Sequence, residues 1–259
     1  MSVNRVERAV ILSAGKGSRL LPLTAERPKC LIELAGKTLL EWQLDALAAG
    51  GIRDVAVVTG FRPDLVDEVI GARDPALGTV RTIFNPFYHV ADNLGSAWMA
   101  REAMDRDFVL LNGDTLIAPG IVRRLIEAEE APICIAVDRK ADYDDDDMKV
   151  LCEGRRVVRI DKKLEPGNFN AESIGFLRFM GEGPRLFVEA ADRVLRTAEG
   201  TGHFYLRVID RLADTGIVAA EGIEGLEWAE VDFPQDVDQA RELTARWRAA
   251  SGDRSPARA

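Results

Sequence analysis

Short apolar runs alternate with amphipathic segments over the first half of the chain. Each run is apolar throughout rather than alternating in polarity, as in strands that are covered on both faces. These runs predict strands at residues 8–14, 54–60, 79–84, 107–114 and 131–137, with helical patterns between them at 38–49, 63–72, 95–105 and 119–129. A strand that alternates repeatedly with a helix predicts an α/β fold, in which helices flank a Rossmann-like, mostly parallel sheet.

The rhythm changes near residue 140. A hairpin turning at Glu153 and Gly154 and a strand at ESIGFLRF predict a small mixed β part, followed by helices at 184–197 and 203–214 and a strand ending at EWAEVD. We therefore expect one domain, residues 1–250, without an internal linker. Within this domain we expect an α/β part at about 7–138, a mixed β part at about 139–232 and a closing helix at about 234–248. A disordered tail is expected after the domain, at 251–259.

A glycine-rich loop follows the first predicted strand. Gly15 and Gly17 allow backbone N–H groups to approach an anion closely, and Arg19 can add a two-pronged contact. The loop is not a P-loop, because Gly17 occupies the position of the Ser or Thr that follows Gly-Lys, and it is not a dinucleotide fingerprint, because Leu20 occupies the position of the third glycine. Because ligands of parallel sheets bind where strands end, the loop predicts a phosphate site, although a tight turn would give the same short pattern.

Composition and charge exclude several classes of protein. The chain has 259 residues and a net charge of −9 with dispersed Lys and Arg, so it lacks the clustered positive charge of a nucleic-acid-binding protein. No apolar run approaches the ~20 residues of a membrane span, and the N-terminus lacks the pattern of a signal peptide. We expect a cytoplasmic protein that binds neither nucleic acid nor membrane.

The segment AGKGSRLLPLTAERPKCLIELAGKTLLEWQL resembles the signature of the nucleotidyltransferase family that makes NDP-sugars and CDP-alcohols. That signature runs G-x-G-x-R, P-L-T, P-K and G-K-x-L-L-E. The resemblance implies the nucleotide-diphospho-sugar transferase type of fold, with residues 7–138 binding the nucleotide and residues 139–232 the acceptor. It also implies a set of nucleotide and catalytic contacts, at Leu12, Ala14, Gly15, Lys16, Gly17, Arg19 and Lys29.

The resemblance extends to two aspartates. Asp114 ends the predicted strand in LLNGD, and Asp232 lies in AEVDFPQD, where the family places its metal carboxylates. Either residue alone could be a helix cap or a strand-end residue. Together they imply a Mg²⁺ site, which suits nucleotidyl transfer because a hard cation offsets converging phosphate charges as pyrophosphate leaves.

The segment expected to contact the base departs from the sugar branch of the family. Sugar nucleotidyltransferases often carry P-x-G-T-[AG]-x-A, whereas this chain has Asn93, Gly95 and Ser96 within DNLGSA. This difference favours the CTP-dependent enzymes that act on phosphocholine, inositol phosphate or phosphonates. Asn93 and Ser96 would read cytosine, although Asn93 could instead cap the helix that begins near Gly95.

The acceptor site is expected in the second half, where IDKKLEPGNFNAESIGFLRF resembles the family segment that binds the acceptor. Either Lys162 or Lys163 would bind its phosphate, and Asn170 and Glu172 its hydroxyl or amine. The four aspartates of residues 144–147 are interpreted as a solvated turn. We thus predict a Mg²⁺-dependent cytidylyltransferase that releases pyrophosphate and can form a homodimer. The alternatives are a sugar-1-phosphate uridylyl- or thymidylyltransferase and an inactive nucleotide-binding regulatory subunit.

Overall fold

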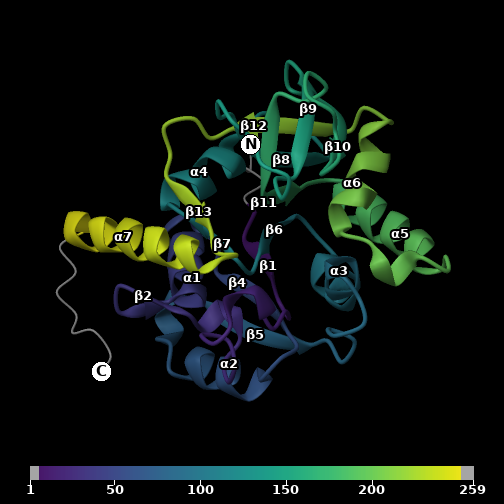
Figure 1. Cartoon of the computed structure of the whole chain (residues 1–259). Coiled ribbons are helices and arrows are strands. Elements are labelled where there is room, and N and C mark those ends of the chain that lie inside the picture. Colours follow the sequence, from purple (N-terminus) through teal and green to yellow (C-terminus); the bar gives the residue numbers. More distant parts are fainter. Residues whose placement is uncertain (1–5, 252–259) are drawn as a thin grey trace.

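The computed structural model describes residues 6–251, so the predicted disordered tail at 251–259 lies almost entirely outside the described residues. Within the described part, nine strands form one sheet in the order β5-β4-β1-β6-β11-β8-β12-β10-β9 (Figure 1). In that order the strands are Thr79–Phe84, Asp54–Thr59, Arg8–Ser13, Phe108–Asn112, Ala171–Phe179, Ile133–Asp138, Val218–Gly222, Arg156–Asp161 and Lys149–Glu153. Two short pairs, β2–β3 and β7–β13, comprise Glu33–Leu34, Lys37–Thr38, Thr115–Ile117 and Trp228–Glu230.

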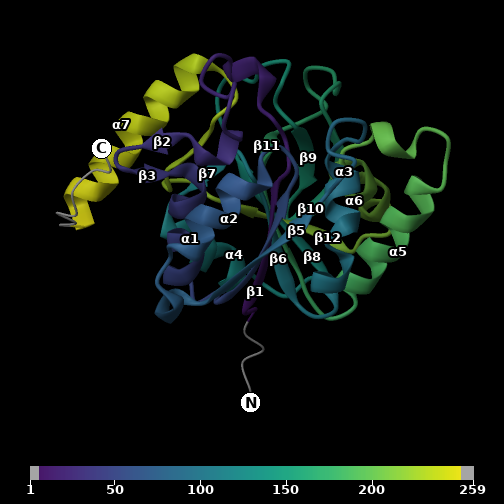
Figure 2. The ribbon, with the colours of Figure 1, turned by 90° about the horizontal axis from the view of Figure 1, so that it is seen from below.

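Helices cover both faces of the sheet, as Figure 2 shows. The helices α1 to α7 span Leu39–Ala49, Pro63–Gly71, Asn93–Met99, Pro119–Glu127, Gly183–Leu195, Tyr205–Ala213 and Pro234–Ser251. Helices α1, α2 and α4 share one hydrophobic core, and α3, α5 and α6 share another on the opposite face. The last helix, α7, packs with β2 and β13 in a third apolar cluster away from α5 and α6 (Figure 1).

Strands β5, β4, β1 and β6 pair in parallel, as expected from the alternating pattern, and β8 and β12 form a further parallel pair. The fifth predicted strand, β8, does not pair with β6, because β11 inserts between them antiparallel to both. The expectation that every strand is covered on both faces is wrong for β5. It is an edge strand whose side chains are half-buried or exposed, and Phe84 is 52% exposed.

The beginning of α1 explains part of the glycine-rich signature. Strands β2 and β3 form a hairpin that turns at Gly36, which has a φ of +90°. Thr38 then caps α1, since its hydroxyl accepts from the Glu41 backbone N–H while the Glu41 carboxylate accepts from the Thr38 backbone N–H. The G-K-T-L-L-E run is therefore a turn followed by a capping box.

The predicted helix at residues 95–105 begins two residues earlier than expected and is interrupted. It comprises α3 and a separate 3-10 turn, Arg101–Met104. No helix within residues 6–251 is long and apolar enough to span a membrane.

Candidate functional site

The glycine-rich loop leaves the carboxyl end of β1 and is held in place by the segment that follows it. Gly17 has a φ of +73°, and a Cβ added there would lie 2.9 Å from the Lys29 Cβ. The buried Thr24 hydroxyl donates to the Gly17 carbonyl at 2.7 Å. The P-L-T and P-K parts of the signature thus fix the shape of the loop. A Cβ added to Gly15, by contrast, meets no described atom within 4 Å.

This difference predicts separate effects for two alanine substitutions. Gly17→Ala should lower the free energy of unfolding by ~1–3 kcal/mol, because a positive φ is strained for a residue with a Cβ. Gly15→Ala should leave the melting temperature unchanged and weaken nucleotide binding, because its Cβ would enter space beside the loop. Calorimetry and nucleotide titration on both variants separate the effects, and equal melting temperatures would contradict the assigned role of Gly17.

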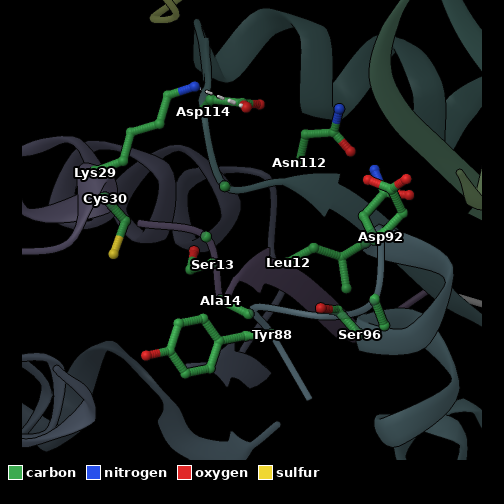
Figure 3. Close-up of a pocket in the computed structure, with 14 residues that line it drawn as sticks. Leu12, Ser13, Ala14, Lys29, Cys30, Tyr88, Asp92, Ser96, Asn112 and Asp114 are labelled. Atoms are coloured by element: carbon green, nitrogen blue, oxygen red, sulfur yellow. Dashed lines mark hydrogen bonds and ion pairs between the residues drawn. The ribbon is translucent and has the colours of Figure 1, made fainter. Parts of the chain in front are cut away.

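Lys29 reaches from the 3-10 turn Lys29–Leu31 to two carboxylates. Its Nζ lies 3.0 Å from Asp114 Oδ2 and also pairs with Asp232 Oδ1. Figure 3 shows its side chain directed at Asp114. Burial lowers the pKa of this ammonium, but the charges of Asp114 and Asp232 outweigh burial and hold the pKa above its usual value. Lys29 is therefore a permanent positive charge at the end of the parallel strands.

Asp114 lies at a sharp corner between β6 and β7. The buried Gln43 side chain on α1 clamps this corner, because its Nε2 donates to the carbonyl oxygens of Asn112 and Thr115, each at 2.8 Å. Asp114 Oδ1 is buried and has no hydrogen-bond partner within the described part of the chain. Such an orphaned carboxylate oxygen is a candidate cation ligand.

A third carboxylate completes an acidic group that the sequence analysis missed. One oxygen from each of Asp114, Glu230 and Asp232 lies within 4.8 Å of the others. Glu230 and Asp232 are two residues apart at the end of β13, so the two-residue period of an extended chain could have revealed that they share a face. Glu230 is an exposed residue as a whole, but desolvation of its carboxyl raises its pKa to about 8, and the charges of Asp114 and Asp232 act in the same direction.

These residues fit a Mg²⁺ ion. The donor set consists of carboxylate oxygens, which hard cations prefer, and one of its members has an unpartnered buried oxygen. Lys29 pairs with Asp114 and Asp232, and Arg19 lies 3.1 Å from Asp232. The carboxylates therefore already lie within reach of the two cations expected to bind phosphate.

A cavity of roughly 230 Å³ opens between the loop and α3. Lys29 and Asp114 lie at one end and Ser96 at the other (Figure 3). Several predicted residues line it, namely Leu12, Ala14, Gly15, Lys29, Asn93, Ser96 and Asp114. The lining also includes residues that the sequence analysis did not single out, among them Ser13, Tyr88, Asp92, Asn112 and Gly113.

Four predicted nucleotide or catalytic residues do not line this cavity. Lys16 is exposed and lies over the Phe61 ring, while Gly95 faces a separate pocket beside Trp98. Gly17 packs against the Lys29 side chain, and Arg19 lies 3.1 Å from Asp232.

Asn93 is the first residue of α3 rather than its cap, which is Asp92. Its Oδ1 accepts a hydrogen bond from the Tyr205 backbone N–H at 2.9 Å, and this contact orients the side-chain amide. The Tyr205 hydroxyl donates to Asn112 Oδ1, also at 2.9 Å. Helix α6 thereby ties the base-binding candidate to the strand end that precedes Asp114.

The two candidate lysines of the acceptor segment differ in their surroundings. Lys162 Nζ lies 2.8 Å from Asp146 and 5.5 Å from the Phe204 ring centre, whereas Lys163 is exposed and makes no ion pair within residues 6–251. Asn170 is bonded at both ends of its amide to the Cys152 backbone, which fixes the edge of the mixed sheet. Of the two lysines, Lys162 is the one connected to the site.

Glu172 is almost fully buried, with 3% of its surface exposed. It lies on β11, two residues before Ile174, whose carbonyl accepts a hydrogen bond from the Thr115 hydroxyl at 3.0 Å. Lys140 Nζ bridges Glu172 at 2.9 Å and Asp147 at 2.8 Å. Burial raises the pKa of Glu172 to about 7; Lys140 opposes the shift, and Asp147 adds to it.

The interpretation of residues 144–147 as a solvated turn is wrong for two of the four aspartates. Asp146 forms ion pairs with Arg19 and Lys162, and Asp147 forms one with Lys140. The Asp144 carboxylate accepts backbone N–H groups of the same turn, as expected of a turn residue. The sequence could not separate these roles because the four neighbours are chemically identical.

Residues 9–144 match the MobA-like NTP transferase domain family, and these residues include the glycine-rich loop, Lys29 and Asp114. The chain belongs to this family. The match confirms the nucleotidyltransferase resemblance drawn from the signature.

Two curated relatives extend the likeness beyond the matched domain. The CMP-5'-(3-aminopropyl)phosphonate synthase of Streptomyces rubellomurinus is 32% identical over 90% of this chain, and the bifunctional IPC transferase and DIPP synthase of Rubrobacter xylanophilus is 34% identical over 96%. The chain spans only 38% and 54% of the lengths of these two relatives.

The fold matches that of a solved structure. The structure of the inositol-1-phosphate CTP transferase from T. maritima superimposes with a TM-score of 0.76 at 22% identity, covering 95% of this chain and 97% of that one. This likeness confirms the predicted nucleotide-diphospho-sugar transferase type of fold.

Proposed function

We propose that this nucleotidyltransferase condenses CTP with a small phosphorylated alcohol or a phosphonate, giving a CDP- or CMP-linked product and pyrophosphate. The observation that carries the proposal is the meeting of the glycine-rich loop, Lys29 and the acidic group Asp114, Glu230 and Asp232 at one end of the cavity. The phosphonate synthase and the IPC transferase among the relatives support this class of acceptor.

The reaction needs positioning and charge rather than a protein nucleophile. An oxygen of the acceptor phosphate attacks the α-phosphorus of CTP, and the bond to the β-phosphate oxygen breaks as pyrophosphate leaves with its electron pair. Arg19 and Lys29 stabilise the charge on the transferred and leaving groups. Cys30, which lines the cavity, is not a nucleophile, because burial raises the pKa of its thiol to about 12.

A Mg²⁺ ion fits this chemistry. Asp114, Glu230 and Asp232 would hold it, and when bound it supplies positive charge that offsets the repulsion between the phosphates. The residues around it have their own tasks: Gln43 fixes the corner that presents Asp114, and Lys29 holds the carboxylates near the glycine-rich loop.

The orientation of Asn93 supports CTP. Its Oδ1 is engaged by the Tyr205 backbone, so its NH₂ group is the end available to a base in the cavity. The O2 and N3 atoms of cytosine are both acceptors and suit such a donor, whereas uracil presents an N3–H donor. Ser96 adds a hydroxyl at the same end of the cavity.

The charge near Glu172 supports an acceptor with a cationic end. Glu172 and Asp147 are two carboxylates that share the single ammonium of Lys140, so the group carries a net negative charge when both are ionised. Lys162 lies on the same side of the site and suits the acceptor phosphate. A homodimer stays a prediction.

A substrate panel tests the proposal directly. The four NTPs are each combined with 2-aminoethylphosphonate, phosphocholine, inositol 1-phosphate and glucose 1-phosphate, and pyrophosphate release is measured. We expect turnover with CTP and an amine-bearing phosphonate or phosphate ester. Equal turnover of glucose 1-phosphate with UTP or dTTP would move the protein to the sugar branch.

Glu172→Gln tests the cationic end of the acceptor. Loss of one charge-assisted contact should raise the KM for 2-aminoethylphosphonate or phosphocholine by ~10-fold and change the KM for CTP little. The melting temperature should change little, because Gln has nearly the same shape as Glu and burial disfavours the charge that the substitution removes. A parallel rise in both KM values would instead indicate general damage to the site.

A further inference from the structure

The four aspartates of residues 144–147 contain one carboxylate that joins the two halves of the site. Asp146 Oδ2 lies 2.7 Å from Arg19 Nη1, and Asp146 Oδ1 lies 2.8 Å from Lys162 Nζ. Arg19 comes from the glycine-rich loop, and Lys162 follows β10 in the acceptor segment. A single carboxylate from the loop between β8 and β9 therefore bridges a nucleotide cation and an acceptor cation.

The bridge places an anion where the proposed reaction requires phosphate. Arg19 and Lys162 are the cations assigned to the CTP phosphates and the acceptor phosphate, and Asp146 offers each of them one oxygen, as a bridging phosphate would. The Lys162 hydrogen bond, aided by the Arg19 charge, holds the pKa of Asp146 below its usual value, so the carboxylate is ionised at neutral pH.

The bridge is exposed enough to exchange. The side chains of Arg19, Asp146 and Lys162 are 51%, 38% and 31% exposed. Ion pairs in contact with water contribute little net stability, because each partner is readily hydrated. A polyphosphate carries more charge than one carboxylate and can displace it from both cations.

We propose that Asp146 is an internal competitor for phosphate, which holds Arg19 and Lys162 at bridging distance in the free enzyme and is displaced when polyphosphate binds. Displacement from both cations leaves Lys162 available to the second substrate, so Asp146 couples the two binding sites. This inference rests on the proposed function for the assignment of Lys162 to the acceptor.

The test uses pyrophosphate, which has neither base nor acceptor group, so its result does not depend on the choice of CTP. Calorimetric titration at a fixed Mg²⁺ concentration compares the wild type with Asp146→Asn. Removing one competing charge should tighten pyrophosphate binding by about fivefold. The gain should shrink as salt is added, because exposed charges are screened.

Asp145→Asn is the matched control. The Asp145 carboxylate lies in the same run of aspartates but forms no ion pair within residues 6–251. The Kd of the Asp145→Asn variant for pyrophosphate should therefore equal that of the wild type. Asp146→Ser is measured in parallel, so that the test can still be made if one of the two Asp146 variants does not fold. Binding by the Asp146 variants that is unchanged or weaker would overturn the proposal, whereas failure of CTP in the substrate panel would overturn only the proposed function.

Discussion

Asp114→Asn should lower kcat by ~10³-fold or more, because an amide is a poor ligand for a hard cation and the ion supplies several kcal/mol of charge stabilisation. The fold should persist, since Gln43 holds the corner through the backbone of Asn112 and Thr115 rather than through the Asp114 side chain. Steady-state kinetics over a range of Mg²⁺ concentrations, with the melting temperature recorded alongside, measures both effects.

Chelation by EDTA should mimic this substitution in the wild-type enzyme, and added Mg²⁺ should restore the activity. Near-normal turnover of the Asn variant in Mg²⁺ would show that the ion is held elsewhere. Glu230→Gln should have an intermediate effect, because Asp114 and Asp232 would remain as ligands.

Lys29→Met should lower kcat by ~10²-fold or more, because a preorganised charged donor at the reacting phosphate is lost. It also leaves Asp114 and Asp232 without the ammonium that lies between them. The kinetic defect should therefore appear in kcat as well as in the KM for CTP. A lower melting temperature with unaltered kinetics would instead show that Lys29 has only a structural role, as a side chain that packs against Gly17.

Local patterns in the sequence predicted the parts of the fold that depend on local physics. The continuous apolar runs gave β1, β4 and β6, and the G-K-T-L-L-E run marked the beginning of α1 through its capping box. The insertion of β11 between β6 and β8 could not be predicted in this way, because pairing partners distant in sequence leave no local pattern. The exposure of β5 follows from its place at the sheet edge, which the sequence does not reveal.

The residues of the candidate site likewise fall into those that a local sequence pattern predicts and those that depend on long-range contacts. Gly15, Lys29 and Asp114 could be predicted because the family signature lies in one stretch and at one strand end, and the structure brings them around one cavity. Glu230 was missed, although its spacing from Asp232 held the signal. Gln43 contacts Asn112, which is 69 residues away, and Asp146 contacts Arg19, which is 127 residues away, so only the folded structure reveals these roles.

The proposed reaction joins CTP to a small phosphorylated or phosphonate acceptor at this site. Phosphorus-31 NMR of the wild-type enzyme with CTP, Mg²⁺ and 2-aminoethylphosphonate follows every phosphorus atom of the reaction at once. We expect a new pair of coupled signals from a CMP–phosphonate anhydride, together with an equal amount of pyrophosphate. Unchanged CTP with this acceptor and with phosphocholine and inositol 1-phosphate, beside formation of a nucleotide sugar from glucose 1-phosphate and UTP or dTTP, would contradict it.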